Sequence, residues 1–364
     1  MKKNNRRLQA IAAGVAAITV LGAGSVATAL TGGGSSSSAA TAAHGIPASV
    51  TLATDLAAHT PGSGPTWNDS IYFTSEVKAG GHDFGVLVHT MRMPNRDKRT
   101  MTVSITDEKT GWYKNYETGI AKDDYTWSTS GLNIKMPGLS WTGNAQKMFV
   151  KAATPWGSLD LQLKAEGPVM NYAGTGLWDM HGAQQYEFAL PSMRTTGTLS
   201  VQGRTHKVFG ESWLDRQWGP LPQSLVRWTW MNLSLPNGDK VAVWDSLGGT
   251  TENAWATVLH PDGSYDLAAV KPLADSAHRF WDSPTSGNTY PTRWRLEIPS
   301  LKTDVAVRII GTDAQEIVGT LGNRIEGTAA FSGIYEGKKV TGKNYVEMVG
   351  NWSASQPSSA QAQR

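Results

Sequence analysis

The chain has 364 residues, of which 40% are hydrophobic and 17% are charged, so it is long enough for roughly two domains with sizeable cores. Cysteine is absent, which excludes disulfides, thiol catalysis and metal sites built on cysteine. The net charge is +3, but four basic residues lie within positions 1–7, and the near-neutral remainder argues against nucleic acid as a partner.

Residues 1–29 have the features of an export signal. A basic stretch precedes the apolar run 8–26, and residues 27–29 (Ala-Thr-Ala) supply a small-x-small cleavage pattern. We predict cleavage near Ala29 and a secreted or extracytoplasmic protein. A membrane-anchoring helix is the alternative, and the Arg6-Arg7 pair leaves twin-arginine export open.

The segment after the predicted cleavage point, residues 30–46, is rich in small residues and is predicted to be a disordered linker. No later segment reaches about 18 uninterrupted apolar residues, the length that a transmembrane helix needs. We therefore expect no transmembrane segment in the mature chain.

Short segments in which apolar and polar residues alternate recur along the rest of the chain. Residues 101–106, 159–164 and 293–298 follow this period of two, and Asn237-Gly238 indicates a hairpin turn. Such strands over about 300 residues favour an all-β fold of antiparallel sandwiches or barrels, in two units rather than one.

Two prolines interrupt the strand pattern at 219–222 (Gly-Pro-Leu-Pro) and are the best candidate for a boundary. This places an N-terminal domain at 47–219, a C-terminal domain at 220–353 and a disordered tail at 354–364.

Residues 210–219 (Gly-Glu-Ser-Trp-Leu-Asp-Arg-Gln-Trp-Gly) carry the most informative mixture of side chains. Buried charges are costly unless they are paired, so a purely apolar core would not select this mixture. On a strand, Trp213 and Asp215 share one face, and Arg216 and Trp218 share the other. We expect Asp215 or Glu347 within ion-pair reach of Arg216, and the block against an inter-domain cavity. The alternative is a structural ion pair that closes a barrel end.

Two further segments combine acids with aromatic residues. Trp244-Asp245 follows the Trp228–Trp230 segment, and burial of Asp245 would raise its pKa and make a proton donor available near neutral pH. An aspartate that opens a turn is the alternative. In the last predicted strand, Tyr345 and Glu347 share one face; Glu347 either points inward or lies outward on an edge strand.

Several familiar chemistries lack their motifs. The mature chain contains no His-x-His, His-Glu-x-x-His, Gly-x-Ser-x-Gly, dinucleotide-binding or P-loop pattern. We therefore expect no metal site and no cofactor. The histidines His89, His181 and His206 are expected at the surface or at a pocket rim.

The block at 210–219 resembles a Gly-x-x-Trp-x-Asp-Arg/His-x-Trp-Gly signature of the two-domain lipocalin-like proteins related to carotenoid hydratase (hydroxyneurosporene synthase) and kievitone hydratase. Trp244-Asp245, residues 290–294 (Tyr-Pro-Thr-Arg-Trp) and residues 345–350 (Tyr-Val-Glu-Met-Val-Gly) are also similar. Many bacterial members are called only lipocalin-like or secreted hydrolase. The chain departs from the carotenoid hydratases at Arg216, where those enzymes have His.

The resemblance implies two tandem lipocalin-like antiparallel β-barrels with a pocket near their junction for a hydrophobic, terpenoid- or polyketide-like molecule. It implies a secreted, cofactor-independent hydratase or lyase that works by acid-assisted addition, elimination or rearrangement. A carrier without catalysis and a hydrolase that uses a carboxylate-activated water are the alternatives, and the oligomeric state stays open.

The resemblance also assigns roles to residues. Asp245 would be the general acid, Asp215 and Arg216 a polar clamp, and Glu347 the group that orients water or Arg216. The aromatic residues predicted to line the pocket, two of them (Trp218 and Trp230) by stabilising a carbocation, are Trp213, Trp218, Trp230, Trp244 and Tyr345.

Overall fold

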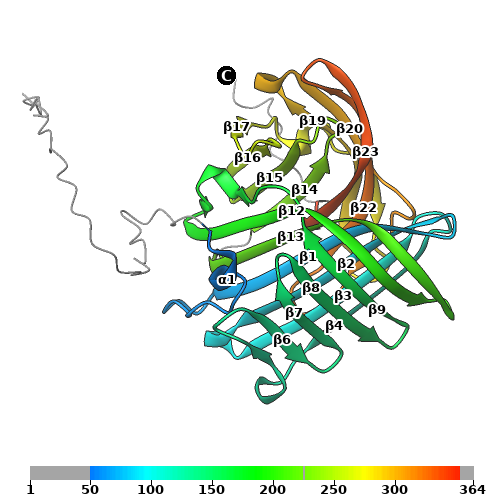
Figure 1. Ribbon diagram of the computed structural model, residues 1–364. Helices are drawn as coiled ribbons and strands as arrows, with labels where there is room; N and C mark the ends of the chain where they lie inside the picture. The colour runs from blue at the N-terminus through cyan, green and yellow to red at the C-terminus, as the bar shows by residue number, and fades with distance from the viewer. Residues whose placement is uncertain (1–49, 224–225, 353–364) are drawn as a thin grey trace, which may run out of the picture. The chain divides into compact units, whose positions relative to one another are not determined.

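The computed structural model describes residues 50–223 and 226–352, and these form two antiparallel β-sheets (Figure 1). The predicted signal peptide (1–29), the linker (30–46) and the tail (354–364) lie outside the described residues. No helix within the described part of the chain is long and apolar enough to cross a membrane.

Strands that precede residue 221 make up the first sheet. They are β1 (Trp67–Ala79), β2 (His82–Met93), β3 (Lys98–Asp107), β4 (Trp112–Gly119), β5 (Thr126–Trp127), β6 (Leu132–Met136), β7 (Leu139–Asn144), β8 (Lys147–Thr154), β9 (Gly157–Ala165), β10 (Met170–Asn171), β11 (Leu177–Met180), β12 (Ala183–Val201) and β13 (Arg204–Pro220). Neighbouring strands follow the order β4-β3-β2-β1-β13-β12-β9-β8-β7-β6-β5, and β10 and β11 pair with β12. The sheet curls around its own core.

Strands that follow residue 225 make up the second sheet. They are β14 (Val226–Ser234), β15 (Lys240–Gly248), β16 (Thr251–Leu259), β17 (Tyr265–Ala269), β18 (His278–Asp282), β19 (Thr289–Ile298), β20 (Thr303–Ile309), β21 (Glu316–Ile317), β22 (Arg324–Tyr335) and β23 (Lys338–Val349). Their order is β17-β16-β15-β14-β23-β22-β20-β19-β18, with β21 paired to β22. The prediction of an all-β fold with two tandem antiparallel β units is confirmed.

Helical segments in the described residues are single turns. They are the α-helices α1 (Leu52–Asp55) and α2 (Leu273–Ser276) and the 3-10 helices η2 (Pro94–Arg96), η3 (Lys122–Asp124), η4 (Tyr172–Gly174) and η5 (Pro299–Leu301). The last strand of the first sheet ends at Pro220 and the first strand of the second sheet begins at Val226, close to the boundary predicted at 219–222. The division into domains at 219 and 220 stays a prediction.

Each sheet encloses its own apolar core, and a third apolar cluster joins the two sheets. Along β1, Ile71 and Phe73 face the first core, whereas Tyr72 between them belongs to the third cluster. This follows from the alternation of side chains in a strand, and it explains why β1 is buried on both faces. The third cluster includes Tyr72, Leu87 and Trp213 from the first sheet and Trp230, Trp244 and Tyr345 from the second.

Close approach of the two sheets depends on a glycine in β2. A Cβ at Gly85 would lie 1.7 Å from Cγ2 of Thr328 on β22, so no larger residue fits there without movement. The glycine thus allows the sheets to meet at this point.

Candidate functional site

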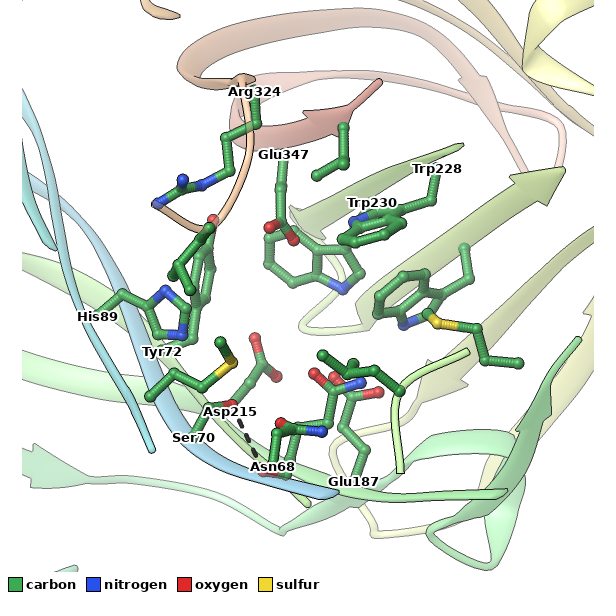
Figure 2. Close-up of a pocket in the computed structure, with 17 residues that line it drawn as sticks. Asn68, Ser70, Tyr72, His89, Glu187, Asp215, Trp228, Trp230, Arg324 and Glu347 are labelled. Atoms are coloured by element: carbon green, nitrogen blue, oxygen red, sulfur yellow. Dashed lines mark hydrogen bonds between the residues drawn. The ribbon is translucent and has the colours of Figure 1, made fainter. Parts of the chain in front are cut away.

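A cavity of about 110 Å³ lies between the two sheets, and its wall mixes carboxylates with aromatic rings (Figure 2). Strands β1, β2, β11, β12 and β13 of the first sheet supply one side, and β14, β15, β22 and β23 of the second sheet supply the other. The lining residues are Asn68, Ser70, Tyr72, His89, Met91, Met180, Glu187, Asp215, Gln217, Leu221, Trp228, Trp230, Trp244, Leu321, Arg324, Glu347 and Val349.

Asp215 of β13 contributes a buried carboxyl to this cavity. Its Oδ1 accepts hydrogen bonds from the Tyr172 hydroxyl and from the Trp213 indole, both at 2.8 Å. Burial raises the pKa of Asp215 to about 7, although both hydrogen bonds favour the charged form. The carboxyl is therefore poised to exchange a proton near neutral pH.

Glu187 of β12 lies beside Asp215 and is also buried. Its Oε2 accepts a hydrogen bond of 3.0 Å from the Trp178 indole. Burial and then the charge of Asp215 raise the pKa of Glu187 well above its usual range. Because Glu187 is neutral, this part of the cavity does not hold a second negative charge beside Asp215.

Glu347 reaches the cavity from β23, in the second sheet, and its carboxyl faces the space that Asp215 faces from the first sheet (Figure 2). Burial raises the pKa of Glu347 to about 7, against the opposing effects of Arg324 and of the Trp228 indole. Two carboxyls that titrate near neutral pH thus stand on opposite walls of one cavity.

Arg324 of β22 is held in place by two acids. Its Nε lies 2.9 Å from Glu326 Oε1, and its Nη2 lies 2.8 Å from Glu117 Oε2. The Tyr72 hydroxyl donates to the other oxygen of Glu326 at 2.6 Å. Arg324 and Tyr72 therefore line the cavity while their polar groups are bonded to Glu117 and Glu326.

Indole rings from the second sheet form the apolar part of the wall. Trp228 and Trp230 lie on β14 and Trp244 lies on β15, and the rings of Trp228 and Trp244 are 6.3 Å apart at their centroids. The Trp230 indole donates to the Tyr172 hydroxyl at 3.1 Å, which links this wall to the hydrogen bonds around Asp215. A flat hydrophobic molecule would fit such a wall.

A family model described as AttH-like matches residues 48–351. The chain belongs to the AttH-like family. Kievitone hydratase of Fusarium solani subsp. phaseoli is 29% identical over 209 residues, which are 54% of this chain and 58% of that protein. Dehydratase asqC of Emericella nidulans is 27% identical over 219 residues, which are 57% of this chain and 62% of that protein. The match thus spans less than two thirds of each of these relatives.

Two solved structures share the fold of this chain. Kievitone hydratase from Nectria haematococca has a TM-score of 0.67 at 25% identity, over 78% of this chain and 89% of that one. A putative AttH protein from Nitrosomonas europaea has a TM-score of 0.68 at 18% identity, over 83% and 97% of the two chains, and shares the fold. The predicted resemblance to the kievitone hydratase group is confirmed.

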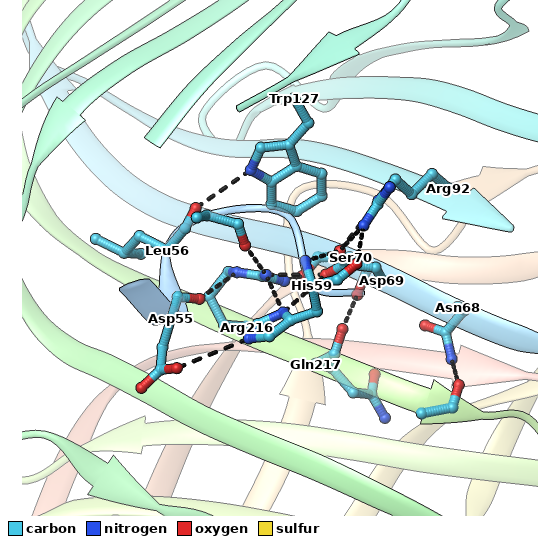
Figure 3. A network of polar contacts seen from close by, with 12 residues as sticks. Asp55, Leu56, His59, Asn68, Asp69, Ser70, Arg92, Trp127, Arg216 and Gln217 are labelled. Carbon is cyan, nitrogen blue, oxygen red and sulfur yellow. Dashed lines mark hydrogen bonds and ion pairs between the residues drawn. The ribbon is translucent and has the colours of Figure 1, made fainter. Parts of the chain in front are cut away.

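Arg216 of the AttH-like protein follows Asp215 on β13, so its side chain points to the opposite face of the strand. Figure 3 shows its guanidinium among Asp55, His59 and Asp69. Its Nη2 is 2.8 Å from Asp69 Oδ1, and its guanidinium lies 4.5 Å from the ring centroid of Trp127. The backbone carbonyls of Asp55, Ala57 and Ser70 accept further hydrogen bonds from its guanidinium, which also contacts Nδ1 of His59. The prediction that Arg216 pairs with Asp215 or Glu347, as a polar clamp in the cavity, is wrong.

Asp245 of the AttH-like protein is buried but lies outside this cavity. Because Trp244 faces the cavity, its neighbour on β15 points the other way, and Asp245 Oδ2 accepts the backbone N–H of Leu273 at 2.7 Å. Burial and then Glu252 raise the pKa of Asp245 to about 7. The prediction that Asp245 points into the pocket is wrong, although its predicted burial and raised pKa are present.

The predicted aromatic residues divide between three places. Trp230 and Trp244 line the cavity with the carboxyls. Trp213 and Tyr345 line a second cavity of about 90 Å³ between the sheets. Trp218 shares the face of Arg216 and stacks on His59 with ring centroids 3.8 Å apart, so its predicted place in the substrate pocket is wrong.

Sequence reasoning did not identify most of the lining residues, among them the titratable side chains of Tyr72, Glu187 and Arg324. His89 was expected at the surface or at a rim, whereas only 9% of it is exposed. The Arg324-Ile325-Glu326 spacing was a usable signal, because residues two apart share a face of a strand and can form an ion pair. Among the described residues, no group of three or more His, Asp or Glu side chains is arranged to hold a metal ion.

Proposed function

We propose that this AttH-like protein adds water to, or removes water from, a hydrophobic small molecule held in the cavity between the sheets. The observation that carries the proposal is a pair of carboxyls on opposite walls of an aromatic cavity, the buried Asp215 and the half-buried Glu347, both with pKa values of about 7. The relatives named kievitone hydratase and dehydratase support the same reaction class. The reaction needs no cofactor, and the protein acts outside the cytoplasm after removal of residues 1–29.

Asp215 is the proposed general acid. Its Oδ1 already accepts two hydrogen bonds, so Oδ2 carries the proton. That proton adds to one carbon of a substrate double bond, whose electron pair forms the new C–H bond and leaves a carbocation on the other carbon. An acid is most effective when its pKa lies near the working pH, which favours Asp215 over its more strongly protonated neighbour Glu187.

Glu347 is the proposed base on the opposite wall. Water attacks the carbocation and forms the C–O bond, and the proton that this water loses passes to the Glu347 carboxylate. Dehydration is the same sequence in reverse, with Glu347 donating and Asp215 accepting. In both directions the faces of Trp228 and Trp230 stabilise the cation through their π-electrons.

A mass-spectrometric screen tests this function. The protein is incubated with terpenoid alkenes and with tertiary terpenoid alcohols, and products are compared with a heat-inactivated sample. We expect gain or loss of the mass of one water by a single product. Retention of an unchanged molecule would instead support the carrier, and cleavage into two products would support the hydrolase.

The pH dependence of kcat/KM should be bell-shaped with its maximum near pH 7. Below that pH the Glu347 carboxylate becomes protonated and cannot accept a proton, and above it Asp215 loses the proton that it must donate. The two apparent pKa values belong to the interacting pair. A profile that is flat between about pH 5 and about pH 9 would contradict these roles.

A further inference from the structure

His89 is a buried imidazole on the first-sheet wall of the cavity that the proposed mechanism does not use. It lies on β2 directly opposite Tyr72 of β1, and the two rings meet edge to face with centroids 5.4 Å apart. Only 9% of the residue is exposed, and it lines the cavity. Its Nδ1 is buried and has no hydrogen-bond partner in the described structure.

The polar neighbours of His89 form hydrogen bonds with other residues. The Tyr72 hydroxyl donates to Glu326, and the Arg324 guanidinium is bonded to Glu326 and Glu117. A buried polar atom without a partner costs free energy, so most such atoms in proteins are satisfied by protein, water or ligand. The free Nδ1 therefore marks a place for a hydrogen-bonding group of a bound molecule.

The charge state of His89 restricts what that group can be. Burial and then the charge of Arg324 lower the pKa of His89 to about 3, so the ring is neutral at neutral pH. A neutral imidazole offers one donor and one acceptor, which suits a hydroxyl or a carbonyl oxygen. The Glu347 carboxylate, which lines the same cavity, disfavours an anionic group.

We infer that His89 anchors an uncharged oxygen group of the substrate against the first sheet, while an aromatic or other flat apolar body lies on Trp228, Trp230 and Trp244 of the second sheet. Figure 2 shows His89 beside Tyr72, on the side of the cavity away from Trp228. The inference rests on the proposed function for the identity of the cavity. It names His89 as a specificity-determining residue and the substrate as a neutral amphipathic molecule.

Calorimetric titration with a matched pair of probes tests the anchor without any turnover. The probes p-cresol and p-xylene differ by a hydroxyl in place of a methyl group, and p-toluate adds a negative charge. We expect the wild type to bind p-cresol roughly tenfold more tightly than p-xylene, and p-toluate least. In His89→Phe the ratio of p-cresol affinity to p-xylene affinity should fall to near one, and the affinity for p-xylene should be retained. His89→Gln should keep most of the wild-type ratio.

His278→Phe is the matched control, because His278 is an exposed histidine on β18. It should keep the wild-type preference. Retention of the preference in His89→Phe would overturn the inference, as would a wild type that favours p-xylene or p-toluate or binds no p-cresol. Because only binding is measured, a protein that shows this preference but never changes a substrate would disprove the hydration chemistry and leave the anchor intact.

Discussion

Replacing Asp215 with Asn should lower turnover by ~10²–10⁴-fold, the usual contribution of a general acid, while ligand affinity changes little. Asparagine keeps the size of the side chain and can still accept hydrogen bonds from Tyr172 and Trp213, but it carries no transferable proton. The measurement is kcat and KM on a substrate from the screen, at the optimum pH of the wild type.

Asp245→Asn is the matched control for this substitution. Asp245 is another buried aspartate with a pKa raised to about 7, but it lies outside the cavity. Its replacement should change kcat by no more than a few-fold. Equal losses in the two variants would contradict the role of Asp215, because they would reflect a general effect of removing a buried carboxyl.

Measurements of the free energy of unfolding show whether Asp215→Asn loses activity because a proton donor is gone or because the fold is damaged. The pKa of Asp215 rises from 3.8 to about 7 on folding, so within that window the folded protein binds a proton that the unfolded chain has lost. The free energy of unfolding therefore falls as pH rises through the window, and the loss is complete above it. Asp215→Asn has no carboxyl that must ionise in the folded state, so it does not lose stability in this way. At about pH 8 the variant should be at least as stable as the wild type.

Replacing Asp69 with Asn should lower the free energy of unfolding by about 3–5 kcal/mol, the usual cost of breaking a buried ion pair. Asp69 and Arg216 are both fully buried, and Asp69 also pairs with Arg92 at 2.8 Å. The substitution leaves Arg216 without its counter-charge in the first core. Chemical denaturation of the two proteins at neutral pH measures the difference.

The control is Asp304→Asn, which breaks an exposed ion pair with Arg295 and should cost about 0–1 kcal/mol. Burial alone would raise the pKa of Asp69, but Arg216 first, and then His59 and Arg92, hold it well below its usual range. The stabilisation is therefore present above about pH 4 and is lost as pH falls further, which Asp69→Asn should abolish. Comparable losses of unfolding free energy in the two variants would show that the buried Asp69–Arg216 ion pair does not stabilise the fold.

Alternation along the chain was enough to predict the all-β class and the two faces of the central block. It separated Asp215 from Arg216 correctly, but it could not supply the partner of Arg216. That partner, Asp69, lies on β1, and only the pairing of β1 with β13 brings the two residues together. Such long-range register is a property of the assembled sheet.

The choice of face failed for Asp245 for a different physical reason. Both faces of β15 are buried, since Val243 belongs to the second core and Trp244 to the cluster between the sheets. Alternation shows that Trp244 and Asp245 point apart, yet it cannot show which face meets the other sheet. Glu187 and His89 lie in strands without any motif, so only the fold reveals that they meet at the cavity.

The proposed chemistry depends most directly on a proton that Asp215 keeps at neutral pH. Infrared difference spectroscopy between the wild type and Asp215→Asn can detect that proton through the carbonyl band of a protonated carboxyl. We expect a band that is absent from the variant and that disappears in the wild type with a midpoint near pH 7. Absence of the band at about pH 6, or a midpoint near the ordinary aspartate value of about 4, would contradict the role of Asp215 as the general acid.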